Sequence, residues 1–103
     1  MYKLTFYVPD THVEPVKQAV FAAGAGRIGH YEACSWQVMG QGQFCPLKGA
    51  TPFIGAANQL ETVSEWRVEM VVDDAHIHNV ISTLKQAHPY ETPAFDVVKI
   101  EQY

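Results

Sequence analysis

The chain has 103 residues, close to the commonest size of a single domain and too short for two. Charged residues make up only 17% of it, below the usual quarter, which favours a surface partly buried against a partner or a second copy. The formal net charge is −4 and the seven basic residues are scattered, so we expect no nucleic-acid partner.

The N-terminal segment MYKLTFYVPD alternates polar and apolar residues, unlike the continuous apolar block of a signal peptide. No apolar stretch elsewhere approaches the roughly 18 residues of a membrane span. We therefore expect a cytoplasmic protein with no membrane partner. Two cysteines are too few for a disulfide scaffold, and in a reducing compartment they stay as thiols.

The N-terminal part of the chain predicts a strand followed by a helix. Tyr2 to Val8 alternates with the period of two that a half-buried strand shows. Thr11 followed by Glu14 has the spacing of a capping box, and Gly24 and Gly26 close the helix that follows. The apolar stripe of this helix consists of Val13, Val16, Val20 and Ala23.

The middle of the chain is less regular. Cys34 to Met39 predicts a strand, and Gly40 and Gly42 predict a turn back into a second strand from Gln43 to Cys45. The segment from Pro46 to Asn58 predicts an ordered loop, because it contains apolar anchors among its prolines and glycines.

The C-terminal part predicts a second strand, helix and strand. Val63 to Val72 alternates as a strand, Asp73 or Asp74 caps the next helix, Pro89 stops it, and Ala94 to Ile100 forms the last strand. The buried stripe of this helix consists of Ile77, Val80, Ile81 and Leu84.

The order of elements predicts one α+β domain over residues 1–103, with the ferredoxin-like split βαβ plan. In that plan an antiparallel sheet carries both helices on one face, here with an inserted hairpin and loop. The opposite face is too mixed for a second core and suits water or a partner subunit. Its predicted members are Lys3, Thr5, Tyr7, Arg67 and Glu69.

The most unusual string is HPYETP, residues 88–93, where two prolines hold polar side chains in a short, stiff segment. In the functional interpretation His88 and Glu91 bind a cation or a polar ligand group, with the Tyr90 hydroxyl nearby. In the alternative the string is a rigid corner, and His88 caps the final carbonyls of the preceding helix.

A second string, residues 26–31, contributes His30 and Tyr31. Its glycine spacing does not match a phosphate loop, which favours a flexible crossover over a nucleotide site. His30, Cys34 and Cys45 are metal ligands by type, although zinc needs three or four in fixed geometry. The two cysteines are expected either to face one another across the predicted hairpin or to pack as free thiols.

Three strings in order, GAGRIGHYEACSW, GQGQF-P-KGATPFIG and HPYETPAFDV, resemble the small domain of the Nif-three-like (NGG-one-interacting-factor-three-like) family. Cys45, within the second string, departs from the family pattern. The resemblance spans Tyr2 to about Ile100. In longer members this domain is inserted in a metal-binding core, and some bacteria make it as a separate short protein, as we expect here. The domain is similar to PII and CutA proteins, so the resemblance implies a PII/CutA-like fold and a homo-oligomer, with a trimer favoured. The two-metal site of the family lies in the flanking core, so no cyclohydrolase activity is implied for this segment.

The sequence therefore predicts a non-enzymatic, self-associating module that senses a ligand or binds a protein partner. No catalytic residue is assigned. The candidate binding residues are expected to line one pocket at or beside a subunit interface: His30, Tyr31, His88, Tyr90 and Glu91. The alternative is a divalent-metal-binding protein that uses His88 and Glu91 with His30 or Cys34, and a divalent metal ion is the only cofactor indicated. A hydrolase built around Cys34 is a weaker third hypothesis.

Overall fold

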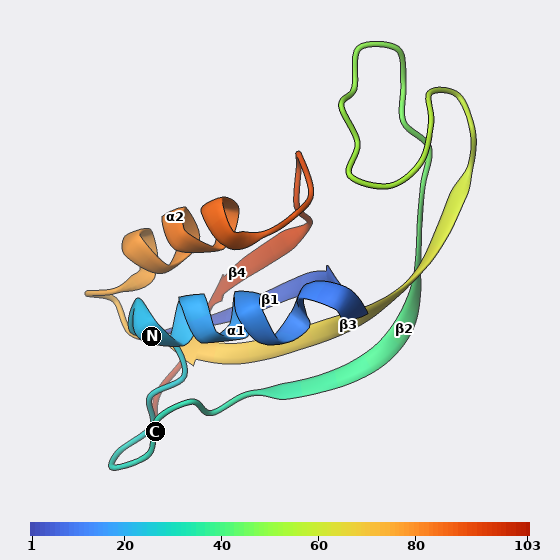
Figure 1. The fold of residues 1–103 in the computed structure, drawn as a ribbon. Helices are drawn as coiled ribbons and strands as arrows, with labels where there is room; N and C mark the ends of the chain where they lie inside the picture. Colours follow the sequence, from blue (N-terminus) through green and yellow to red (C-terminus); the bar gives the residue numbers. More distant parts are fainter.

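The computed structural model describes residues 1–103 as one antiparallel sheet with two helices (Figure 1). The sheet order is β2-β3-β1-β4, which is the order of the split βαβ plan, so the predicted α+β fold is confirmed. In chain order the elements are β1 (Tyr2–Pro9), a 3-10 turn (Asp10–His12), α1 (Val13–Ala22), β2 (Trp36–Phe44), β3 (Glu61–Val72), α2 (Ile77–Ala87) and β4 (Phe95–Lys99).

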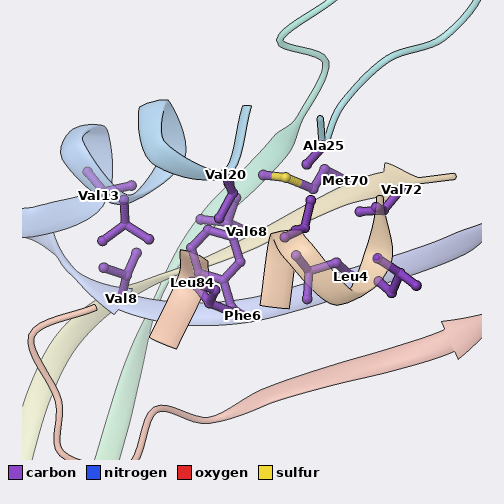
Figure 2. Close-up of a cluster of buried hydrophobic side chains, with 13 residues drawn as sticks. Leu4, Phe6, Val8, Val13, Val20, Ala25, Val68, Met70, Val72 and Leu84 are labelled. Carbon is purple, nitrogen blue, oxygen red and sulfur yellow. The ribbon is translucent and has the colours of Figure 1, made fainter. Parts of the chain in front are cut away.

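A single hydrophobic core lies between the sheet and the two helices (Figure 2). The alternation of β1 and β3 turns every second side chain toward the helices, and the predicted stripes of α1 and α2 meet them. Ala23 and Ile81 are only partly buried and pack against the outside of this core. The buried members are Leu4, Phe6, Val8, Val13, Val16, Val20, Ala25, Val68, Met70, Val72, Ile77, Val80 and Leu84.

The two helices begin differently from one another. The predicted capping box is wrong, because Thr11 lies inside the 3-10 turn and its hydroxyl bonds the ring of His12 instead of a helix N–H. The N-cap residue of α2 is His76, so the prediction that Asp73 or Asp74 occupies this position is wrong. The Asp73 carboxylate instead accepts a hydrogen bond from the backbone N–H of His76 at 3.0 Å, in the turn just before the helix. The other, Asp74, pairs with the N-terminal amine.

The predicted hairpin at Gly40 and Gly42 is also wrong. All nine residues of β2 pair with β3, and the chain reverses only in the loop over residues 45–60. The two glycines are ordinary extended strand residues here, and neither has a positive φ. The chain does not turn at these glycines, because pairing with β3 forms a longer ladder of backbone hydrogen bonds than a tight hairpin would.

The two cysteines consequently lie at opposite ends of β2. Cys34 precedes the strand, half-buried, and Cys45 follows it, exposed; both are free thiols. The length of a nine-residue strand, roughly 25 Å, separates them. The predicted pairing across a hairpin, as a bridge or a shared metal site, is therefore wrong within one chain, and the thiols flank the strand instead of packing in it.

The β2–β3 ribbon extends past the helices as a curved arm, and the loop over residues 45–60 folds at its end (Figure 1). This arm explains why the radius of gyration is 14.5 Å, above the roughly 13 Å expected for a compact domain of this length. Neither helix has the length and apolar character needed to cross a lipid bilayer.

Candidate functional site

The five predicted binding residues are divided between the two ends of the sheet. The helices α1 and α2 run antiparallel, so the segments that follow them leave at opposite ends (Figure 1). After α1, the backbone N–H of Gly26 donates to the carbonyl of Val71, and Val71 is the β3 partner of Lys3 on β1. After α2, the ring of His88 contacts the carbonyl of Tyr7, near the other end of β1. Lys3 and Tyr7 are four residues apart on β1, roughly 13 Å.

His30 and Tyr31 belong to the segment that follows Gly26, at the end of the sheet away from His88. They are exposed on a tight turn closed by two backbone hydrogen bonds between Ile28 and Tyr31. Within one chain they do not line a pocket with His88, Tyr90 and Glu91. A pocket shared by all five residues across a subunit interface stays a prediction.

His88 is a structural residue within the corner. Its side chain is buried, its Nε2 contacts the Tyr7 carbonyl at 2.6 Å, and its Nδ1 accepts from the Tyr90 N–H at 3.1 Å. A carbonyl can only accept and a backbone N–H can only donate, so the hydrogen resides on Nε2 and both ring nitrogens are occupied. Burial lowers the pKa of His88, which favours the neutral ring that this arrangement requires.

His88 is the C-cap residue of α2, and its backbone N–H donates to the Leu84 carbonyl at 2.9 Å, so the interpretation of His88 as a cap of its own helix is confirmed for the backbone. The ring does not cap the helix. The residue has extended backbone angles, φ −71° and ψ 137°, so its side chain leaves the helix and reaches β1. The backbone N–H of Tyr7 donates to the carbonyl of Ala94, the residue before β4. The Tyr7 carbonyl points toward the same edge of β1, but the β4 ladder does not extend far enough to reach it. The imidazole of His88 therefore supplies the hydrogen-bond donor for the Tyr7 carbonyl that a longer β4 would otherwise provide.

Tyr90 and Glu91, which follow Pro89 in the corner, contact a strand and a loop. The Tyr90 hydroxyl donates to Glu65 Oε2 at 3.2 Å, and burial together with the Glu65 charge raises the pKa of Tyr90 to about 12. The Glu91 carboxylate accepts from both the N–H and the hydroxyl of Thr51, at 3.2 and 2.7 Å, and these bonds lower its pKa. Glu91 therefore ties the corner to the loop over residues 45–60.

These contacts border a pocket of about 460 Å³ between the loop, the corner and the ends of β2 and β3. Eight of its fourteen lining residues are hydrophobic. The rings of Phe44 and Phe53 lie 6.3 and 6.4 Å from the Tyr90 ring, centroid to centroid. This volume falls within the usual range of small-molecule sites, about 300–1,000 Å³.

Gly42 leaves the space that the Glu65 side chain occupies. A Cβ atom at this position would lie 2.1 Å from Glu65 Oε1, whereas a Cβ at Gly40, two residues earlier on the same strand, would meet nothing within 4 Å. The strand glycine therefore has a steric role in the pocket, where the sequence suggested a turn.

Sequence reasoning found Tyr90 and Glu91 but missed the other half of this pocket. Glu65 reads as an ordinary solvent-facing member of an alternating strand, and Thr51 as one polar residue of a loop. Phe53 is one of the apolar anchors of the loop predicted over Pro46 to Asn58, and the sequence does not indicate its place in a pocket. In the structure its ring contacts the ring of His12 edge-on at 5.2 Å. The pocket depends on how the loop folds back, which no local pattern encodes.

Comparison with known proteins places these elements in a family. No protein-family model matches the chain. It is 50% identical over 95 residues to a Mycobacterium leprae protein named GTP cyclohydrolase 1 type 2 homolog, covering 92% of this chain and 25% of that protein. A Bacillus cereus protein related to NIF3 has a solved structure that matches 98% of this chain and 26% of its own, with 38% identity and a TM-score of 0.83.

The chain is a homologue of one domain of the NIF3-related proteins. It spans about a quarter of the length of the relatives that it matches, so their whole-protein activity is not transferred to it. The PII-like protein CutA of a Nostoc species matches 98% of this chain and 82% of its own, with a TM-score of 0.69 at 20% identity. That likeness confirms the CutA/PII-like fold.

The residues of the predicted metal site do not come together within one copy of this NIF3-like domain. No group of three or more His, Cys, Asp or Glu side chains is placed to hold a metal ion. His88 has no free ring nitrogen, and Glu91 lies at the other end of the sheet from His30 and Cys34. A metal site from these residues stays a prediction that needs ligands from a second subunit.

Proposed function

We propose that this NIF3-like domain is a non-enzymatic module that self-associates and binds a small ligand or a protein partner. The observation that carries the proposal is the unpaired outer edge of the sheet, which is formed by β2. The outer edge of β2 has no partner over nine residues, and Trp36, Val38 and Met39 are exposed on it. Proteins rarely leave a long apolar edge strand uncovered, because it pairs readily with another chain.

The open sheet face supports the same proposal. The strand register places the predicted polar residues of β1 and β3 together there, with Trp36 and Val38 beside them. Trp36 is 62% exposed, and Arg67 pairs with Glu69 at 2.8 Å in the middle of the face. An exposed aromatic ring beside an aliphatic side chain is typical of the core of a subunit interface, and Arg67 and Glu69 carry charges that are already paired with one another. The resemblance to PII and CutA proteins favours a trimer.

Light scattering coupled to gel filtration tests the assembly. We expect a mass near three times the 11.5 kDa of one chain, constant across the micromolar range. Trp36→Glu should reduce the mass toward that of one chain, since it places a charge at the exposed apolar edge. Gln86→Glu, the same added charge on the exposed side of α2, is the matched control and should leave the mass unchanged.

A mass of one chain at every concentration would contradict the self-association proposed here. An oligomer that persists in Trp36→Glu would show that β2 is not its interface. The ligand-binding half of the proposal is tested separately, at the pocket.

A further inference from the structure

The pocket at the end of the β2–β3 arm has charges of one sign only. Among its lining residues Glu65 and Glu91 are the only ones charged at neutral pH, and no Lys, Arg or His is among them. Neither carboxylate takes part in an ion pair. The hydrogen bonds to Glu91 hold its pKa low, so it is ionised near neutral pH.

Both carboxylates keep the capacity to bind a donor. Glu65 accepts one hydrogen bond, from Tyr90 to Oε2, and Glu91 accepts two from Thr51. An ionised carboxylate has about four acceptor positions, so each has some unused. The donors that already contact them are neutral, and they fix the carboxylates in place without cancelling their charge.

The rest of the wall is apolar and aromatic. The rings of Phe44, Phe53 and Tyr90 surround the space, and an aromatic face attracts a cation as well as an alkyl group. An anionic ligand would meet two carboxylates here and no compensating charge. A neutral apolar ligand would leave both carboxylates desolvated and unpaired, at a cost in affinity.

We infer that this pocket binds a small organic cation, an amine or guanidinium carried on an apolar aliphatic or aromatic body. The cation contacts Glu65 and Glu91, and the body packs against the aromatic wall. The inference rests on the ligand-binding half of the proposed function and names its ligand class.

Titration of the full chain with small probes, followed by amide signals in NMR spectra, tests the inference. The cationic probes are 2-phenylethylamine and agmatine; 3-phenylpropionate carries a similar ring with an anionic end, and 2-phenylethanol a neutral one. We expect saturable shifts at the amides of Thr51 and Thr92 with at least one cation, and none with the anion. The amide of Gly29, at the other end of the sheet, is the internal control and should not shift.

Variants separate charge from shape. Glu65→Gln and Glu91→Gln keep an acceptor for Tyr90 and Thr51 but remove the charge, so each should weaken cation binding at least tenfold. Gly42→Ala should also weaken it, because the new Cβ displaces the Glu65 carboxylate. Gly40→Ala adds the same methyl group where nothing lies within 4 Å, and should bind as the unmodified chain does.

The outcomes distinguish this inference from the function that it rests on. Binding of 3-phenylpropionate or 2-phenylethanol as tightly as the amine would overturn the cation assignment and leave a ligand-binding module standing. Binding by neither cation, or cation binding unchanged in both glutamine variants, would also overturn the inference. Light scattering on the same samples reports self-association independently of all these results.

Discussion

Replacing His88 with alanine tests whether the HPYETP corner depends on its histidine. The change removes the donor to the Tyr7 carbonyl, and an unpaired buried carbonyl costs about 1–3 kcal/mol. It also removes the ring that lies 4.8 Å from the Tyr90 ring, a contact of about 0.5–1.5 kcal/mol. We therefore expect His88→Ala to lose about 2–4 kcal/mol of unfolding free energy near neutral pH. Urea unfolding followed by circular dichroism measures the loss.

The same residue predicts a pH dependence. Its folded pKa is lowered from 6.5, so the unfolded chain binds more protons below that value. The stability that neutral His88 contributes is fully present above pH 6.5 and is lost as the pH falls from there through the lowered folded pKa. The pKa values of Asp73 and Glu91 are lowered from 3.8 and 4.5, so their contributions are lost at more acidic pH. Unfolding measured from about pH 7.5 to about pH 5.5 therefore isolates the histidine.

His30→Ala is the matched control, because His30 is exposed on a turn and its ring makes no hydrogen bond. Its effect should stay within about 0.5 kcal/mol. His88→Ala should flatten the loss of stability with falling pH, and His30→Ala should preserve it. A His88→Ala protein as stable as the unmodified chain, or one with the same pH dependence, would refute the structural role of this ring.

Two further variants test the packing. Leu84→Ala leaves a cavity in the core, where Leu84 is fully buried, and should cost about 2–5 kcal/mol; an unchanged urea midpoint would show that this face of α2 is placed wrongly. Trp66→Phe removes the indole N–H that donates to Asp10 at 2.7 Å. A double-mutant cycle with Asp10→Ala should give a coupling free energy of about 1 kcal/mol. A coupling of zero would exclude a contribution of this hydrogen bond to stability.

The fold could be predicted because each core segment keeps one regular spacing of apolar residues, a period of two in the strands and about 3.6 in the helices. Every second residue is apolar in β1 and in β3 from Trp66 onward, and the stripes of both helices recur at helical spacing, so burial and local pattern agree. The edge strand β2 has no such agreement. Its residues are exposed or half-buried throughout, and its side chains therefore place little constraint on register or turn. Gly40 and Gly42 predict a turn, because nothing in the local sequence records the pairing of β2 with β3.

The candidate site was half predicted for a related reason. Tyr90 and Glu91 stand in a conspicuous string, whereas their partners are 25 and 40 residues away and come together only through the folded arm. His88 was conspicuous for the same reason, but its ring belongs to the sheet. The two interpretations of the string, rigid corner and binding site, are therefore not exclusive. His88 holds the corner against β1, and the side chains of Tyr90 and Glu91 face the pocket.

The arm joins the two proposals, because one strand serves both. Trp36 and Val38, near the start of β2, lie on the exposed face proposed for self-association, and Phe44, at its end, lines the pocket. Glu65 on the paired strand contacts Tyr90 and occupies the space above Gly42. A ligand that moves Glu65 or the loop therefore acts on the strand that would pair with another subunit. If binding changes the association constant by some factor, association must change the ligand affinity by the same factor. Measuring cation affinity at two protein concentrations, one on each side of the association midpoint, tests this coupling, and equal affinities would show that the arm does not transmit it.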